Sequence, residues 1–235
     1  ATGSAIALSR RFSATHYWDD CHRYGATCAP YMGELCRYLL NTPQHPLERA
    51  HSLRVIFGAG LRPDVWTPFV ERFHIPSVYE FYASTEGNVA MVNFEQRPGM
   101  LGKLMPGQEV VRIDPASETL IRTDAGQLQR AKPGDKGVLI GRIDRLNKFE
   151  GYLDRARTRD KVLEDPFGDG RNYFDTGDLV QLHDDRHVSF ADRLGDTFRW
   201  KGENVSTTEV SESLNACPGV LESNVYGVEV PQHEG

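Results

Sequence analysis

The chain has 235 residues, 39% of them hydrophobic and 26% charged, a balance typical of globular proteins rather than disordered ones. Its formal net charge of -6 argues against a nucleic-acid-binding groove, which needs a concentrated basic face. The sequence has no apolar run of transmembrane length and no secretory leader pattern, so we expect a cytoplasmic protein whose only membrane contact would be peripheral.

Cysteines and histidines are the first candidates for metal binding. The four cysteines form no CxxC pair, which predicts reduced thiols. Cys21 lies beside His22, but the uneven cysteine spacing favours packing over zinc binding. His183 and His187 are four residues apart, as helical metal ligands can be. The apolar alternation on both sides of Asp184-Asp185 instead favours the turn of a hairpin.

Over the first 98 residues, short apolar runs alternate with amphipathic stretches of helical period. We expect helices at 13–24, capped by Ser13, at 31–40, and at 63–73, opened by Pro63, and strands at 26–29, 53–57 and 79–82. This order predicts parallel strands joined by right-handed crossovers. Ligands bind beyond the carboxyl ends of such strands, where the sequence places Gly58-Ala59-Gly60 and the turn at 83–88.

After Pro98 the pattern changes to short alternating runs separated by Gly, Pro and Asp. It predicts a small antiparallel sheet or partial barrel, with strands at 109–113, 137–143, 178–183 and 187–191. Ser206 or Thr207 is expected to cap a helix that runs to Ala216, and 220–230 is predicted to be a strand of a further unit. The expected fold class is therefore α/β: a parallel βαβ subdomain over 1–98, an antiparallel β-rich subdomain over 99–191, and the start of an α+β unit over 192–235.

Four polar motifs carry the functional signal: GAGLR (58–62), FYASTEGN (81–88), YFDTGD (173–178) and DRLGDTFRWKGEN (192–204). Taken singly, each motif residue has an ordinary structural interpretation: Asp178 as a turn residue, Arg193 as a solvent-exposed charge and Gly202 as the glycine of a hairpin. In this order they resemble the adenylate-forming acyl-CoA synthetases, and the resemblance covers essentially the whole chain. LCRYLLNTP (35–43) and FRWKGENVSTTEV point to the very-long-chain acyl-CoA synthetase, or fatty acid transport protein, branch.

The resemblance implies a binding site for ATP. Tyr82 would cover the adenine ring, with Ala83 and Ser84 beside it as nucleotide-binding residues. Asp178 would accept hydrogen bonds from the ribose hydroxyls. Another wall of the pocket would be formed by small residues that let the backbone approach a base, namely Gly58, Ala59 and Gly60.

The resemblance also implies how phosphate, metal and coenzyme A would be held. Thr85 would donate its hydroxyl to the phosphate, Glu86 would hold Mg²⁺, and Arg193 would contact ribose and phosphate. Gly195-Asp196 falls where the family has its interdomain hinge, so 192–235 would hold this hinge and the start of the α+β C-terminal lid, and 1–191 would belong to the large adenylating domain. The Gly202 loop would line the channel for the pantetheine arm of coenzyme A.

The implied reaction is that of a long- or very-long-chain fatty acyl-CoA ligase. A fatty carboxylate attacks the α-phosphate of ATP and releases pyrophosphate, and the thiol of coenzyme A then takes the acyl group from acyl-AMP. No side chain need act as a nucleophile, because positioning and charge stabilisation carry the step. Two departures stand out: Ala83 replaces the family's usual Gly, and Asp192 replaces the Gly that commonly precedes the arginine.

The family's Gly/Ser/Thr-rich phosphate loop and its acyl-adenylation lysine are missing from these residues. We therefore expect an internal piece of a longer enzyme, itself inactive. Two alternatives remain open: a non-catalytic adenylate- or lipid-binding piece that serves fatty acid uptake, and a ligase that passes acyl-AMP to a carrier protein. FRWKGEN favours coenzyme A as the acceptor.

Overall fold

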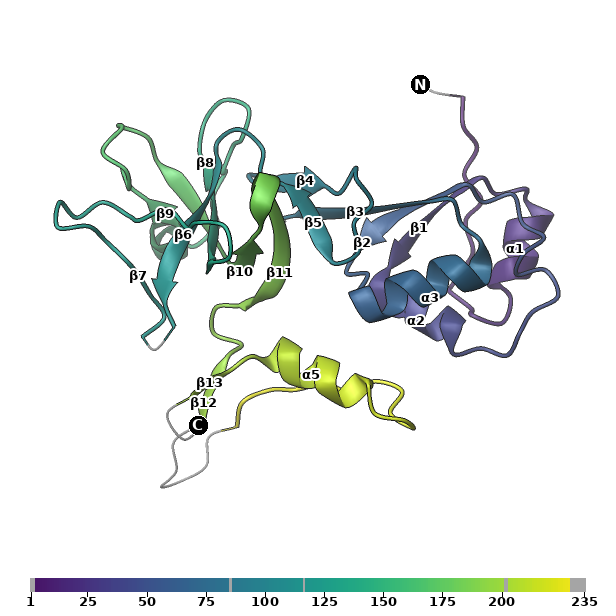
Figure 1. Ribbon diagram of the computed structural model, residues 1–235. Coiled ribbons are helices and arrows are strands. Elements are labelled where there is room, and N and C mark those ends of the chain that lie inside the picture. Colours follow the sequence, from purple (N-terminus) through teal and green to yellow (C-terminus); the bar gives the residue numbers. More distant parts are fainter. Residues whose placement is uncertain (1–2, 85, 116, 201–202, 229–235) are drawn as a thin grey trace. The chain divides into compact units, whose positions relative to one another are not determined.

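The computed structural model describes residues 3–84, 86–115, 117–200 and 203–228 (Figure 1). The chain divides into two compact units. The first runs through Phe81 and adds Val92–Met100; the second consists of Tyr82–Met91 and the residues from Leu101 onward. Within the described ranges, no helix is long and apolar enough to cross a bilayer.

The first unit contains the parallel βαβ arrangement that the sequence predicted. β1 (Cys28–Met32) pairs in parallel with β2 (Val55–Ala59), and β2 pairs in parallel with β3 (Ser77–Ala83). The register places Gly58 of β2 between Tyr31 of β1 and Glu80 of β3. The described residues of the unit form the helices α1 (Tyr17–Arg23), α2 (Gly33–Leu40) and α3 (Pro63–Phe73).

The helices bury aromatic side chains against this sheet. Trp18 of α1 and Phe73 of α3 are fully buried, with their ring centroids 4.5 Å apart. α3 begins with Pro63 at its first position, because a missing amide costs nothing there, and ends at His74 in a left-handed conformation. The predicted bounds of this helix are confirmed.

Other predicted boundaries in the first unit were wrong. α1 begins at Tyr17 behind His16, and Ser13 does not cap it; the Ser13 carbonyl instead accepts the His16 amide in a preceding turn. Tyr31 lies in β1 rather than in α2, because alternate positions of β1 face the core and both Ala29 and Tyr31 are buried. In so short an apolar run, the spacing of hydrophobic residues does not distinguish a helix from a strand.

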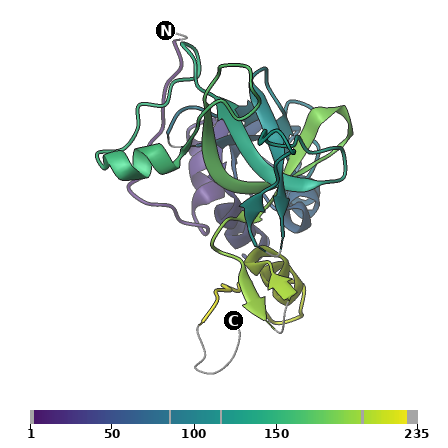
Figure 2. The same cartoon turned by 90° about the vertical axis from the view of Figure 1, so that its left-hand side faces the viewer.

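The second unit contains the predicted antiparallel sheet, with strand order β5-β11-β10-β8-β6-β7 and β9 on β10. The central strand β8 is buried on both faces, with Leu139 in one core and Val138 and Ile140 in another. Figure 2 shows the teal and green strands of this sheet curving around one another, with α4 (Arg155–Asp160) lying apart from them. The strands are β5 (Met100–Lys103), β6 (Gln108–Asp114), β7 (Thr119–Leu120), β8 (Lys136–Arg142), β9 (Val162–Leu163), β10 (Tyr173–Leu182) and β11 (His187–Arg193).

The short strand β4 (Ala90–Val92) follows the FYASTEGN motif. β10 and β11 form the predicted hairpin, closed by a short 3-10 turn, η1 (Asp184–Arg186). His183 bonds to Ser189 at 2.7 Å across this hairpin, and His187 is buried in the sheet. The two histidines therefore contribute to the packing and hydrogen bonding of the hairpin.

The end of the described chain begins with the antiparallel pair of β12 (Phe198–Trp200) and β13 (Glu203–Val205). α5 (Thr207–Asn215) follows, and the side chain of Ser206 accepts the Glu209 amide at 3.2 Å, which confirms the predicted cap. The strand predicted at 220–230 is wrong over 220–228, where the structure has no strand; 229 and 230 lie outside the described residues.

Candidate functional site

The YFDTGD motif forms a bulge inside β10. The register with β8 shifts within this motif, and Gly177 supplies the positive φ of 74° that the bulge requires. The Thr176 hydroxyl donates to a β8 carbonyl at 2.7 Å and accepts the Asp178 amide at 3.0 Å. Asp178 therefore lies within a strand that begins at Tyr173, rather than at the strand's start as predicted. A Thr-Gly pair in an alternating run was the signal for the bulge.

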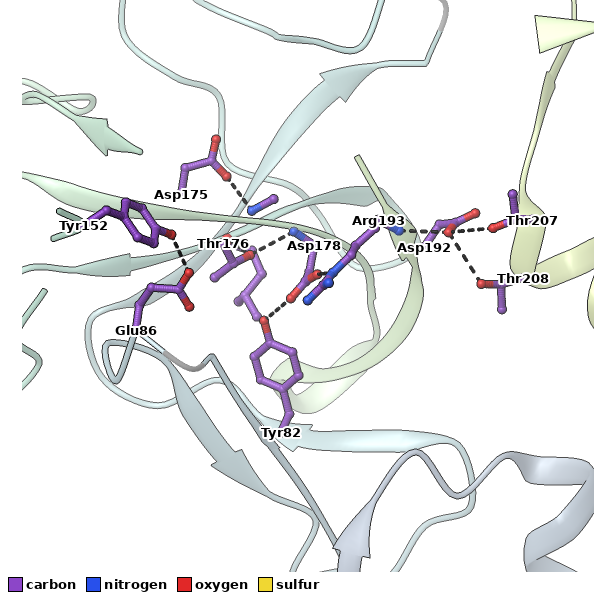
Figure 3. Close-up of polar contacts among 12 residues, drawn as sticks. Tyr82, Glu86, Tyr152, Asp175, Thr176, Asp178, Asp192, Arg193, Thr207 and Thr208 are labelled. Carbon is purple, nitrogen blue, oxygen red and sulfur yellow. Dashed lines mark hydrogen bonds and ion pairs between the residues drawn. The ribbon is translucent and has the colours of Figure 1, made fainter. Parts of the chain in front are cut away.

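Asp178 is a buried carboxylate at the centre of a polar network in the second unit (Figure 3). The register places it opposite Arg193, the last residue of β11 rather than the residue after the strand as predicted, and Arg193 Nε donates to its carboxylate at 2.9 Å. The hydroxyl of Tyr82 donates to the other carboxylate oxygen. Three predicted site residues that are far apart in sequence therefore meet at one carboxylate.

The electrostatics follow from this arrangement. Burial, and then the hydrogen bond to Asp178, raise the pKa of Tyr82, so the phenol remains a donor at neutral pH. The hydrogen bond and charge of Asp178 raise the pKa of Arg193. The network thus holds a neutral donor and a cation on the carboxylate of Asp178, a buried residue.

Glu86, the predicted magnesium ligand, accepts a hydrogen bond from the Tyr152 hydroxyl (Figure 3). The described residues hold no cluster of three or more metal-ligating side chains. A single carboxylate still fits Mg²⁺, because this ion is commonly held by one or two carboxylates together with waters and substrate phosphates. The donor set therefore fits a metal that arrives with a nucleotide.

The remaining described positions of FYASTEGN differ in their burial and in their hydrogen bonds. Ala83 ends β3 and is exposed. The Ser84 hydroxyl is buried and has no hydrogen-bond partner among the described residues, a cost that a ligand could remove. Asn88 is buried and donates to the carbonyls of Arg142 at 3.1 Å and Asn147 at 2.8 Å, which ties the motif to the end of β8. Thr85 lies outside the described residues.

Gly58 and Ala59 are the last two residues of β2 rather than residues beyond the strand as predicted, and Gly60 follows the strand in the first unit. A Cβ on Gly58 would come within 2.1 Å of the Tyr31 carbonyl oxygen and 2.7 Å of its ring, so packing against β1 is itself enough to require glycine there. The amide of Gly60, whose φ is 79°, donates to the carboxylate of Glu80. The sequence had explained these glycines only through a ligand.

Asp192, the departure from the family's glycine, joins β11 to the start of α5. Its buried carboxylate accepts the Ser206 hydroxyl at 2.6 Å. It also accepts the hydroxyls of Thr207 and Thr208 at 3.4 and 3.5 Å (Figure 3). Between the two elements, Gly195 and Asp196 form a turn. Gly202 lies outside the described residues.

Sequence reasoning missed four contacts that hold the motif residues in place, namely those made by Glu80, Tyr152, Thr176 and Asp192. The signal available in the sequence was a glutamate that shares one face of an alternating strand with Val78 and Tyr82. Nothing in the local sequence connects Tyr152 to Glu86, because 66 residues separate them.

Known proteins match this chain in sequence and in fold. Residues 1–138 match the model of the AMP-binding enzyme family. Long-chain fatty acid transport protein 2 of Rattus norvegicus is 44% identical over 99% of this chain, and a medium/long-chain-fatty-acid–CoA ligase of Mycobacterium tuberculosis is 42% identical over all of it. The chain spans 39% of the length of each of these relatives.

Among solved structures, ATP-bound MatB from Rhodopseudomonas palustris shares the fold, with a TM-score of 0.72. That match covers 94% of this chain and 41% of MatB, at 24% identity. The transport-protein relatives agree with the branch that the sequence motifs indicated. Because the family model matches more than half of its residues, the chain belongs to the AMP-binding enzyme family.

Proposed function

We propose that this chain carries part of the nucleotide site of a fatty acyl-CoA ligase, which uses ATP and coenzyme A to activate a long or very long fatty acid. The single observation that carries the proposal is the meeting of Tyr82 and Arg193 at Asp178. Motif positions placed for unrelated structural reasons would not be expected to converge on one buried carboxylate. The names of the transport-protein and CoA-ligase relatives support the substrate class.

In this proposal the network binds the nucleoside. Tyr82 faces the adenine, Asp178 accepts from the ribose hydroxyls, and Arg193 reaches ribose and phosphate. Gly58–Gly60 forms another wall, and Ala83 and Ser84 lie along the nucleotide. The Ser84 hydroxyl, which is buried and has no partner within the described part of the chain, supports this placement, because a buried hydroxyl gains free energy when a ligand satisfies it.

Phosphate chemistry is assigned to the next residues of the motif. Thr85 would donate to the phosphate, and Glu86 would hold Mg²⁺, which supplies neutralising charge at the reacting phosphates. Tyr152 orients the Glu86 carboxylate through its hydroxyl. No residue here is assigned as a nucleophile; the chain contributes positioning and charge stabilisation for attack by the fatty carboxylate.

The coenzyme A half-reaction is assigned to the end of the chain. We place the hinge at Gly195-Asp196 within a lid region of 192–235, and the Gly202 loop at the pantetheine channel. The turn at 194–196 between β11 and β12 supports a hinge there, since a few turn residues can absorb a rotation between domains.

Calorimetric titration of the chain with a non-hydrolysable acyl-sulfamoyl adenosine tests the nucleotide site. We expect saturable binding that Tyr82→Ala and Asp178→Ala each weaken. Asp184→Ala, in the turn between β10 and β11, is the matched surface control and should leave affinity unchanged. The proposal is refuted for this chain if a folded protein shows no binding, or if both site variants bind as tightly as the control.

A further inference from the structure

Glu80 is a buried carboxylate of the first unit to which the proposed function gives no role. It lies on β3 and is 4% exposed. Burying a charge is costly unless hydrogen bonds compensate it. Its presence in the core of a sheet therefore calls for an explanation.

Three donors converge on this carboxylate. One oxygen accepts the Gly60 amide at 2.5 Å, and the other accepts the Tyr31 hydroxyl at 2.5 Å and the Leu61 amide at 3.2 Å. The donors are a phenol and two amides, so none carries a positive charge. Burial raises the pKa of Glu80, and the hydrogen bonds from Tyr31, Gly60 and Leu61 oppose that rise.

The two amides belong to the segment where the chain leaves β2. Gly60 has a positive φ of 79°, and a Cβ on Gly33 would lie 1.7 Å from the Gly60 carbonyl oxygen, so α2 begins in close contact with this segment. Glu80 fixes the segment from its other side. The backbone at 58–61 is thus held by packing and by a carboxylate together.

We propose that Glu80 is a positioning residue for the nucleotide site: through the Gly60 and Leu61 amides, its carboxylate fixes the 58–60 backbone, the wall that distinguishes the base. This inference rests on the proposed function, in which residues 58–60 face the adenine. A backbone wall selects a base through amide and carbonyl groups at fixed places, and a misplaced wall loses this selection.

Glu80→Gln tests the inference because it preserves size while it removes acceptor capacity. Glutamine keeps one acceptor oxygen and turns an NH₂ group toward a donor, so a bond to Gly60 or Leu61 is lost or weakened. Glu48→Gln is the matched control: Glu48 is another buried carboxylate of the same unit, bonded to Arg72 at 2.8 Å and to the His45 amide at 3.0 Å.

The first measurement is amide hydrogen exchange resolved at Gly60 and Leu61, with no ligand present. We expect exchange at these amides to speed up about 10-fold or more in Glu80→Gln and to stay unchanged in Glu48→Gln. Unchanged protection in Glu80→Gln would overturn the inference.

The second measurement compares binding of palmitoyl-sulfamoyl adenosine with that of its inosine counterpart. We expect Glu80→Gln to weaken the adenosine compound about 5- to 10-fold and to bring the adenosine-to-inosine affinity ratio toward one. Glu48→Gln should lower the melting temperature without changing the ratio. If the wild-type protein binds the adenosine compound and Glu80→Gln leaves the adenosine-to-inosine affinity ratio unaltered, this inference alone is overturned. If the folded wild-type protein does not bind, the inference is overturned together with the proposed function.

Discussion

Replacing Asp192 by alanine should release α5 from β11. None of the residues of this helix is fully buried, so polar contacts supply much of what holds it. Ser206 caps the helix and at the same time donates to Asp192, so the same hydroxyl anchors the helix and orders its first turn.

The size of the effect follows from the three hydroxyl contacts. Those of Thr207 and Thr208, at 3.4 and 3.5 Å, lie at the outer limit for a hydrogen bond and count for little. The 2.6 Å bond from Ser206 to a carboxylate belongs to the class that contributes about 1.5–3 kcal/mol. A local loss of about 2 kcal/mol corresponds to about 30-fold faster amide exchange in α5.

Hydrogen exchange of the peptides that span α5 measures this directly. Asp192→Asn keeps one acceptor oxygen that can still bond to the Ser206 hydroxyl, so it should show a smaller increase, although the charge is lost and the other oxygen becomes an NH₂ group. Lys136→Ala is the control, since it removes an exposed 2.8 Å ion pair to Glu209 of the same helix and should change exchange less than about 5-fold. Exchange within twofold of wild type in Asp192→Ala would refute the reasoning.

Three further outcomes are expected. Gly58→Ala should destabilise the first unit by at least about 1–3 kcal/mol in chemical denaturation, because its methyl group would overlap the backbone of β1. In the native protein at pH 8, a thiol reagent should react fast with the two exposed cysteines and slowly with Cys21 and Cys36, since burial raises their pKa values to about 11 and about 12. Burial tends to raise the pKa of Glu48, but hydrogen bonds from Arg72 and a backbone amide leave it lowered. The ionised Glu48 carboxylate therefore stabilises the fold above its unfolded-state pKa near 4.5, and this stabilisation is lost as the pH falls through its lower folded-state pKa. The difference in free energy of unfolding between wild type and Glu48→Gln should therefore narrow on acidification.

The order of helices and strands was predictable because the hydrophobic periodicity and the residues that start or stop these elements agree along most of the chain. Pro63 marks the start of α3, and Ser206 marks the start of α5. The wrong predictions concern positions where a tertiary contact determines the secondary structure. Tyr31 fits a helical stripe by spacing, yet it belongs to β1, where its ring packs over Gly58 and its hydroxyl reaches Glu80. No local pattern encodes a partner 49 residues away.

The residues of the site were predictable by resemblance, but their mutual bonds were not. Motif spacing named Tyr82, Asp178 and Arg193 separately. The structure adds that a bulge turns Asp178 toward the other two, and that this bulge depends on the Thr176 hydroxyl and on glycine at 177. A substitution at Thr176 would therefore act on the site through the backbone of β10.

The burial of Asp178 bears on how a ribose could reach it. Its side chain is 6% exposed, and two donors already bond to the carboxylate, although a carboxylate can accept about four hydrogen bonds. Tyr82 packs against the core of the second unit and cannot move cheaply, whereas the Arg193 side chain is 67% exposed. Because the Asp178 carboxylate is buried, it needs donors when the arginine moves away, and the ribose hydroxyls would take the place of the guanidinium. A ribose would therefore approach from the side that Arg193 covers, and the displaced guanidinium would become available to a phosphate, which reconciles the two roles proposed for these residues.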